Sequence, residues 1–250
     1  MSNSCGILIT AVALLSSFTD PAIGHPRNHD VGNNTHINAF NYQLSLYEED
    51  IFICGAAMLS DEWAITTAHC TQVKNRKELN LRLGISIGEG EAYPVVTVIT
   101  HPLFDDHSLD FDYALLQVKK PFIHPKNQKL NHVSLASRMV DSTWAYVSGW
   151  GTTKDGEEIP AKHLRHANVT VYPHESCKGQ HNGIKKRMIC ASDPIHPKRS
   201  CVGDTGGPLV HKGKLIGMVS WGQHCQNSDD TVVYAAIAPI HKWIRKHLNI

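Results

Sequence analysis

The sequence predicts an all-β protein in which two antiparallel barrels follow one another along the chain. From Phe40 onward, short runs rich in β-branched and aromatic residues are separated by turn residues, which is typical of strands. Strands do not alternate with helical runs, which argues against a parallel α/β fold. A connection between Lys119 and Asn131 divides the strands into two series. At 250 residues and 42% hydrophobic content, the chain can bury a sizeable core.

Residues 1–24 are predicted to be a secretory signal peptide, and residues 25–29 a pro-segment. The apolar run Ile7–Leu15 is followed by the small residues Ser16 and Ser17. This run is too short to cross a bilayer as a helix. Lys and Arg are missing before the run, which weakens the prediction. We expect a secreted, extracellular protein.

The strands of the first barrel, residues 30–122, are expected at Tyr42–Leu46, Phe52–Leu59, Trp63–Thr67, Leu81–Ile87, Val95–Thr100 and Tyr113–Val118. Residues 123–139 are the predicted interbarrel linker. The strands of the second barrel, residues 140–238, are expected at Thr143–Ser148, Leu164–Tyr172, Arg187–Cys190, Pro208–His211, Lys214–Ser220 and Val232–Ile237.

Residues 239–250 are predicted to form a C-terminal helix. Pro239 suits a first helical turn. The helical spacing recurs at Ile240, Trp243, Ile244, His247 and Leu248. This is the only convincingly helical stretch, and we expect it to dock on a barrel.

The charge balance argues against nucleic-acid or membrane partners. The formal net charge is +1 and the sequence pI about 7.7, so no global field attracts polyanions. The short basic runs Lys185–Arg187 and Lys242–Lys246 are interpreted as solvated surface. We expect a monomer with no cofactor.

The cysteines predict disulfides. Cys5 lies in the predicted signal, which leaves Cys54, Cys70, Cys177, Cys190, Cys201 and Cys225. An even number in an exported chain suggests three disulfides, but six cysteines allow fifteen pairings, among which spacing cannot choose.

A metal site is not predicted. No Cys-x-x-Cys occurs, and His163 and His166 lie three residues apart in an expected strand, so their side chains point to opposite faces. Asn33 and Asn168 each begin a glycosylation sequon, although chance matches are common.

Three motifs carry candidate chemistry, in the chain order histidine, aspartate, hydroxyl residue. His69 lies in Thr66–Cys70, Asp112 begins an apolar strand, and Thr205 lies in a glycine-rich loop. A hydroxyl nucleophile needs an imidazole base, and that base needs a carboxylate to fix its tautomer. This chain order is that of the catalytic triad of chymotrypsin, and it differs from the orders in subtilisin and in the α/β-hydrolases.

With these motifs the chain resembles the chymotrypsin-like, trypsin-type serine proteases over residues 30 to 250. The resemblance rests on Thr66–Cys70, Asp112–Leu116, Val147–Gly151, Gly203–Pro208, Ser220–Gly222 and the C-terminal helix. It implies two six-stranded barrels. It also implies the disulfides Cys54 with Cys70, Cys177 with Cys190, and Cys201 with Cys225.

The resemblance also implies a role for each site residue. His69 takes the position of the base, Asp112 of its orienting carboxylate and Thr205 of the nucleophile. Gly203 and Thr205 would supply the N–H groups of an oxyanion hole. Ser220 would support the aspartate, and Ser220, Trp221 and Gly222 would pair with an extended substrate.

The nucleophile loop and the base of the pocket depart from the family pattern. Thr205 stands where a serine is expected, and its extra methyl stiffens the side chain and occupies space. Loss of a working nucleophile costs about a millionfold in turnover. Arg199 stands where trypsin-like enzymes carry an acid, so a Lys or Arg substrate would be repelled, while an acidic one could be attracted.

Two further departures affect the pocket wall and activation. Thr231-Val232 replaces a Pro-Gly pair, and Val232 should project into the specificity pocket, with His224 crowding its rim. In active relatives, an apolar N-terminus freed by cleavage pairs with the aspartate that corresponds to Asp204. In this chain that N-terminus would be Asp30, whose side chain is polar.

The departures favour a non-catalytic homologue that binds other proteins. Two alternatives stay open. One is a weak or altered endopeptidase that uses Thr205, and the other is a decoy that holds peptides without cleaving them. Within the family the chain resembles the group-3 mite allergens and the inactivated scabies-mite paralogues. That resemblance implies host proteins, including complement components, as partners.

Overall fold

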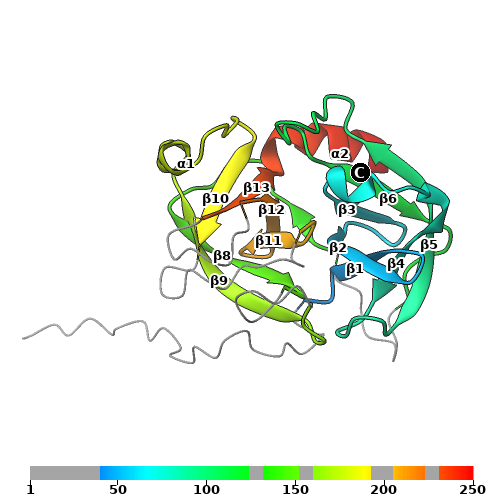
Figure 1. Cartoon of the computed structure of the whole chain (residues 1–250). Coiled ribbons are helices and arrows are strands. Elements are labelled where there is room, and N and C mark those ends of the chain that lie inside the picture. The colour runs from blue at the N-terminus through cyan, green and yellow to red at the C-terminus, as the bar shows by residue number, and fades with distance from the viewer. Residues whose placement is uncertain (1–39, 124–131, 152–159, 193–204, 223–230, 250) are drawn as a thin grey trace, which may run out of the picture. The chain divides into compact units, whose positions relative to one another are not determined.

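The computed structural model describes residues 40–123, 132–151, 160–192, 205–222 and 231–249. The predicted signal peptide and pro-segment lie outside these residues. The expected fold class is confirmed, because the strands form two barrels and a helix ends the described chain (Figure 1). Among the helices in these ranges, none is long and apolar enough to cross a membrane.

The first barrel closes in the order β1-β2-β3-β6-β5-β4. Its strands are β1 (Gln43–Glu48), β2 (Ile51–Met58), β3 (Trp63–Thr66), β4 (Leu79–Leu83), β5 (Glu91–Thr100) and β6 (Ala114–Val118). In β4, buried residues alternate with half-buried ones, which is the period of a strand with one face toward a core. The 3₁₀ turns η2 (His69–Thr71) and η3 (Arg76–Glu78) follow β3.

The second barrel follows the order β11-β8-β9-β10-β13-β12 and closes through pairing of β11 with β12. Its strands are β8 (Thr143–Gly149), β9 (Arg165–Tyr172), β10 (Met188–Ser192), β11 (Pro208–His211), β12 (Lys214–Trp221) and β13 (Val232–Ala236). The short strand β7 (Ser134–Leu135) adds to β12 in parallel. The predicted linker, 123–139, therefore contributes a strand to the second sheet.

Several elements differ from the sequence prediction. Helix α1 (His174–Gln180) was not expected, because seven residues are too few for a clear amphipathic repeat. The strand expected at Leu81–Ile87 is instead Leu79–Leu83, and Ser86 forms only an isolated bridge. The C-terminal helix begins as the 3₁₀ turn η5 (Ala238–Ile240) and continues as α2 (His241–Leu248).

A hydrophobic cluster between the barrels joins them to α2. Ile65 and Leu115 come from the first barrel, Met218 from the second, and Ile240 and Ile244 from the C-terminal helix. All five side chains are buried. Polar contacts reinforce this interface, since the Tyr113 hydroxyl donates to the Ala236 carbonyl at 2.6 Å. The two barrels and α2 therefore share one hydrophobic cluster.

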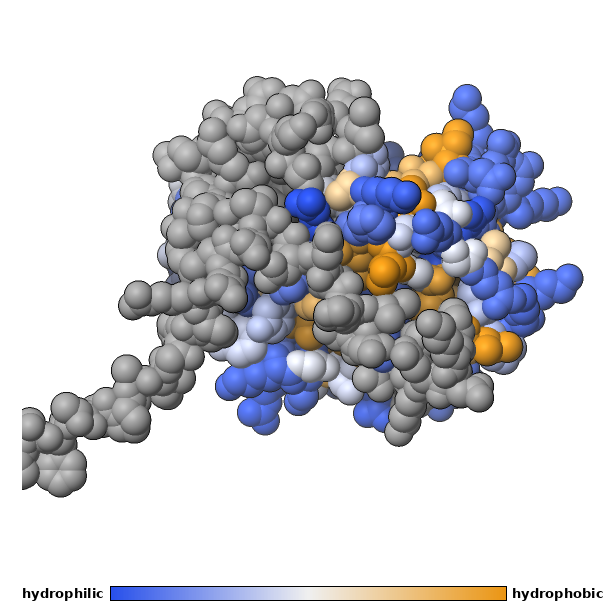
Figure 2. Space-filling model, turned by 90° about the horizontal axis from the view of Figure 1, so that it is seen from below, coloured by the Kyte–Doolittle hydropathy of each residue, from blue (hydrophilic) through white to orange (hydrophobic). Residues whose placement is uncertain are grey.

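Hydrophobic and hydrophilic residues both reach the surface in the coloured part of the face drawn in Figure 2. Hydrophobic residues gather toward the middle of that face and hydrophilic residues toward its margin. Such mixed surfaces are normal for folded proteins, because apolar atoms contribute much of their accessible area.

Candidate active site

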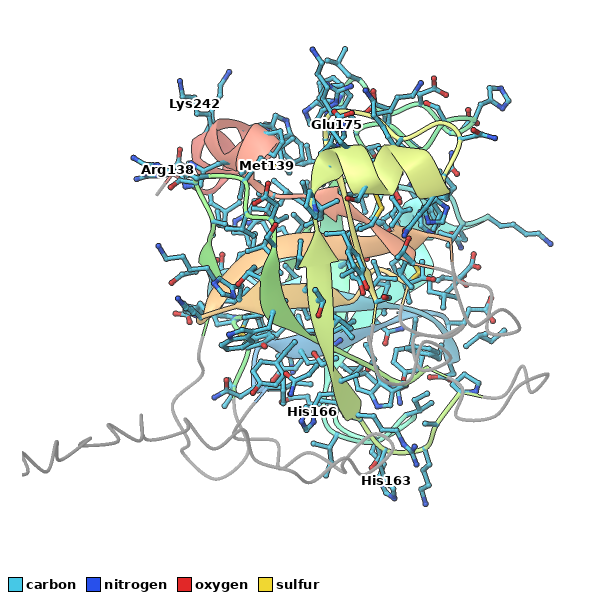
Figure 3. All side chains as sticks on the ribbon, turned by 90° about the vertical axis from the view of Figure 1, so that its left-hand side faces the viewer. Arg138, Met139, His163, His166, Glu175 and Lys242 are labelled. Carbon is cyan, nitrogen blue, oxygen red and sulfur yellow. A yellow bond between two sulfur atoms is a disulfide. The ribbon has the colours of Figure 1, made fainter. Side chains whose placement is uncertain are left out.

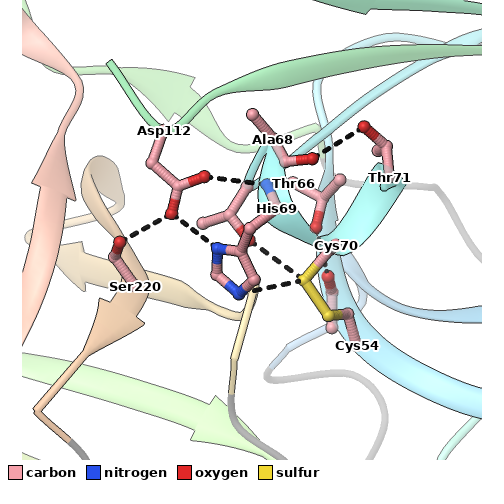
Figure 4. The surroundings of a disulfide bond; sticks show 10 residues. Cys54, Thr66, Ala68, His69, Cys70, Thr71, Asp112 and Ser220 are labelled. Carbon is pink, nitrogen blue, oxygen red and sulfur yellow. Dashed lines mark hydrogen bonds and ion pairs between the residues drawn. A yellow bond between two sulfur atoms is a disulfide. The ribbon is translucent and has the colours of Figure 1, made fainter. Parts of the chain in front are cut away.

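His69 and Asp112 form a directly hydrogen-bonded pair. His69 opens η2 directly after β3, and Asp112 precedes β6, the strand that pairs with β3. Nδ1 of His69 lies 2.7 Å from Oδ2 of Asp112, and the His69 backbone N–H donates to Oδ1 at 3.0 Å (Figure 4). Neighbouring strands of the first barrel therefore bring together residues that are 43 positions apart.

A third donor completes the environment of the aspartate. The Ser220 hydroxyl, on β12, donates to Oδ2 of Asp112 at 2.6 Å. Asp112 is completely buried, so its carboxylate depends on these three hydrogen bonds for solvation. With Nδ1–H donating to the carboxylate, the neutral imidazole keeps its lone pair on Nε2, which is the tautomer of a general base.

The free ring nitrogen of His69 faces a disulfide. Nε2 lies 3.8 Å from Sγ of Cys70, and Cys70 is bonded to Cys54 (Figure 4). Although these three residues cluster closely enough to suggest a metal site, both sulfurs are used in the disulfide. A thiolate ligand is therefore not available at this position.

The backbone after the nucleophile position is held tightly between the barrels. The Thr205 carbonyl accepts from the Gly55 N–H at 2.7 Å, and the Gly206 N–H donates to the Val219 carbonyl at 2.8 Å. Gly206 has φ +76°, and a Cβ there would lie 2.5 Å from both the Gly55 carbonyl oxygen and Thr66 Oγ1. Only glycine fits this turn, so the loop presents the partly exposed Thr205 at a defined place.

Gly222 follows β12 in a left-handed backbone conformation. This glycine has φ +83°, and a Cβ there would lie 3.1 Å from the Thr231 carbonyl oxygen. The preceding Trp221 is half-buried and pairs with Val233 in the register of β12 and β13. Ser220 to Gly222 thus runs directly beside the segment that begins at Thr231.

Val232 is only 3% exposed and lies in the apolar cluster of the second barrel. Residues on one face of a strand alternate, and Tyr234 and Ala236 belong to the same cluster. Val233 faces the other way, toward the Cys177–Cys190 disulfide and Trp221. The branched side chain of Val232 therefore occupies interior space rather than solvent.

Helix α1 contributes two residues that sequence reasoning missed. The Thr231 hydroxyl lies 2.6 Å from Nε2 of His181 and donates to Gln180 at 2.9 Å. The His181 ring also meets the Trp221 ring edge-on at 5.4 Å. No sequence signal marked these residues, because α1 itself was not expected.

The loop before Asp112 is anchored to the second barrel by an ion pair that was also missed. Nε of Arg187 donates to Oδ1 of Asp110 at 2.8 Å, and Nη2 bonds to Oδ2. The Phe111 ring lies between the Arg187 guanidinium, at 4.1 Å, and the His101 ring, at 4.5 Å. Phe111 has φ +54°, a left-handed conformation that this packing holds in place.

Burial lowers the pKa of His101, and the positive charge of Arg187 lowers it further. Nδ1 of the His101 ring accepts a hydrogen bond from the Leu103 N–H at 3.2 Å, which requires that nitrogen to carry no proton. The site therefore contains two histidines with different roles. His69 bonds Asp112 and turns its other ring nitrogen toward the Cys54–Cys70 disulfide, whereas His101 supports the loop that carries Asp112.

The remaining sequence-predicted residues divide into two groups. The Cys177–Cys190 disulfide is present, and Asn168 is exposed on β9. The other positions lie outside the described residues, and these are Asp30, Asn33, Arg199, Cys201, Gly203, Asp204, His224 and Cys225.

His163 and His166 do not share a site (Figure 3). His163 contacts the Ser86 hydroxyl at 3.2 Å, whereas His166 packs against the rings of Phe40 and Tyr146. His163 lies before β9 in an isolated bridge to Ser86, whereas His166 lies on β9.

Comparisons with known proteins cover most of the chain. The model of the trypsin family matches residues 30–244. A trypsin of Simulium vittatum is 36% identical over 214 residues, which cover 81% of this chain and 86% of that protein. The vitellin-degrading protease of Bombyx mori is 30% identical over 255 residues, covering 100% of this chain and 96% of that protein.

A solved structure gives the same result for the fold. Neuropsin, a serine protease expressed in the limbic system of mouse brain, superposes with a TM-score of 0.78 at 28% sequence identity. The superposition covers 87% of this chain and 98% of neuropsin.

Proposed function

The chain belongs to the trypsin family of serine proteases, and from that premise we propose that it is a catalytically inactive member that acts by binding other proteins. The observation that carries the proposal is the threonine at the nucleophile position. The loop around Thr205 is held by backbone hydrogen bonds at Gly55 and Val219, so its course leaves no evident room for adjustment. The extra methyl group of Thr205 would crowd the space in which a substrate carbonyl has to approach, because branching at Cβ restricts the rotation of the side chain.

The position of Val232 supports the same proposal. Its side chain is buried among apolar residues next to the strand that would pair with substrate. Filling a specificity pocket from its wall removes the binding energy that aligns a substrate with the nucleophile. Arg199, which lies outside the described residues, would add a positive charge to the same pocket.

The test is turnover of a fluorogenic peptide library, measured against the Thr205→Ala variant. We expect wild-type protein and Thr205→Ala to give the same background rate, because the threonine contributes no nucleophile. Thr205→Ser alone should also stay at background for Lys and Arg substrates, since Val232 and Arg199 are unchanged. Turnover in the wild type that disappears in Thr205→Ala would overturn the proposal.

A second candidate function is a weak or altered endopeptidase that uses Thr205. The observation in its favour is the His69–Asp112–Ser220 hydrogen-bond network, which leaves Nε2 as a potential base. A diisopropyl-phosphoryl adduct on Thr205, located by peptide mass spectrometry, would support this function. Absence of the adduct under forcing conditions would remove it. A decoy would instead bind uncleaved peptides and lose them on substitution of Gly222.

The resemblance to inactivated scabies-mite paralogues extends the proposal to host proteins, with complement components as the partner class. The protein would then be secreted, which its disulfides fit. We expect added protein to reduce complement deposition in human serum, with Thr205→Ala equally effective because binding needs no nucleophile. Loss of the effect in Thr205→Ala would show that the effect is enzymatic.

A further inference from the structure

Residues 132–141 run past three neighbouring hollows in the surface, which we call the linker groove. Val133 to Leu135 line the first hollow together with His241 and Arg245 of α2. Ala136 to Arg138 line the second, of about 470 Å³, and Met139 to Asp141 line the third. Figure 3 looks onto this side of the chain, with Arg138 beside α2 and Met139 between α2 and α1. One extended segment thus connects all three hollows.

Positive charge is concentrated along the linker groove. Arg138, Lys212 and Lys214 line the second hollow, and Lys186 lines the third. These four side chains are exposed, and none forms an ion pair with a residue that the structure describes. Among the described residues lining the groove, Asp141 is the one acid. This local excess contrasts with a net charge of only +1 for the whole chain.

The groove is a fixed structure rather than a set of loose side chains. Ser134 and Leu135 pair in parallel with Lys214 and Leu215, and the Ala136 N–H donates to the Leu215 carbonyl at 3.0 Å. The backbone that carries Lys214 is therefore aligned with the segment that carries Arg138. Such alignment lowers the entropy lost when a ligand bridges the two cations.

Lys212 occupies a backbone position that rarely holds lysine. Lys212 and Gly213 form the two-residue turn between β11 and β12, with φ values of +47° and +73°. Both values are positive, as in a type I′ turn, for which asparagine is the usual first residue. A side chain kept at an unfavourable φ indicates a role for the side chain itself, and Lys212 lines the second hollow.

From these observations we infer that the linker groove binds a linear sulfated polysaccharide. The segment of ten residues spans at most about 35 Å, which suits an extended polymer better than a small anion. The second hollow is lined by aliphatic side chains and cations, with no Phe, Tyr or Trp among its described lining residues. Among the described lining residues of the whole groove, Tyr172 in the third hollow is the one Phe, Tyr or Trp, so the groove has few of the stacking platforms with which proteins hold single-stranded nucleic acid. The disulfides fit an extracellular protein, and sulfated polysaccharides are extracellular polymers.

The test is the affinity of the full chain for a size-defined heparin oligosaccharide, measured by calorimetry at several salt concentrations. We expect binding at 50 mM NaCl that weakens on the order of 50-fold at 200 mM, as counterion release predicts for four or five contacts. The groove variant combines Arg138→Gln, Lys212→Asn and Lys214→Gln, and should bind about tenfold more weakly with a shallower salt dependence. Asn at position 212 keeps the turn favourable, so the fold should be retained.

The matched control removes the same charge from exposed lysines of the first barrel, with Lys74→Gln, Lys77→Gln and Lys119→Gln. This control should bind like the wild type, and thermal melting should be the same for all three proteins. An equal loss in the control would show general attraction to positive charge and would overturn the inference. So would failure of the wild type to bind at 50 mM NaCl. Equal binding of a single-stranded DNA oligonucleotide would overturn the assignment to a sulfated polysaccharide.

Discussion

The two sides of the candidate active site differ in how closely they follow the residue pattern of the trypsin family. On the first barrel, His69 and Asp112 keep the hydrogen bonds of a base and its orienting carboxylate. The part contributed by the second barrel contains the departures from the family pattern, with Thr205 where a serine is expected and Val232 buried in the apolar cluster of that barrel. The histidine–aspartate pair also has a structural reason that is independent of catalysis. Asp112 is completely buried and needs its donors in order to fold, whether or not a reaction follows.

The largest expected effect is that of removing the buried carboxylate. Asp112→Ala leaves the His69 N–H, the His69 ring and the Ser220 hydroxyl without their acceptor. We expect the free energy of unfolding to fall by about 3–5 kcal/mol, measured by urea denaturation. Thr205→Ala should change it by less than about 1 kcal/mol. Equal losses in the free energy of unfolding for Asp112→Ala and Thr205→Ala would contradict a structural role of the His69–Asp112 pair.

Gly206→Ala tests how firmly the loop on the other side is held. The added Cβ would lie 2.5 Å from the Gly55 carbonyl oxygen at a φ of +76°. We expect a loss of about 2–4 kcal/mol in the free energy of unfolding. Gly213→Ala is the matched control, because that glycine also has positive φ but nothing lies within 4 Å of its Cβ position. If both substitutions cost the same, the close approach at Gly206 is not what fixes the loop.

Asp110→Asn examines the ion pair that anchors the loop before Asp112. The Asp110 and Arg187 side chains are 16% and 27% exposed, and the pair is bidentate. We expect a loss of about 1–2 kcal/mol in unfolding free energy. Asp50→Asn, at an ion pair whose carboxylate is 91% exposed, should cost less than about 0.5 kcal/mol. A ranking in the opposite order would show that the Arg187 contact does not support the site.

The smallest expected effect is a pH dependence that comes from His101. Its pKa is lowered in the folded state, so the unfolded chain binds more protons and stability is lost as pH falls below about 6.5. We expect the melting temperature of His101→Phe to vary less between pH 7 and pH 5 than that of the wild type. His107→Phe, at a fully exposed ring, should behave like the wild type. Parallel pH curves for wild type and His101→Phe would exclude a contribution from His101.

The fold and the histidine–aspartate pair could be predicted from sequence because their signals are local. Alternating strands and turns indicate barrels, and His69 and Asp112 lie in short motifs with a defined chain order. Helix α1 and the Asp110–Arg187 pair could not be predicted in this way. A short helix gives little periodicity, and the pair joins residues 77 positions apart through tertiary packing alone.

The cluster that joins both barrels to α2 has a consequence for synthesis of the protein. All strands of the first barrel have been made by Val118, but Ile65 and Leu115 find their final partners only after Ile240 and Ile244 have followed. A growing chain therefore exposes part of an apolar surface until more than a hundred further residues have been added. Contacts of such long sequence separation form slowly, and unpaired apolar surface favours aggregation. Nascent chains halted before α2 should accordingly be substrates for chaperones.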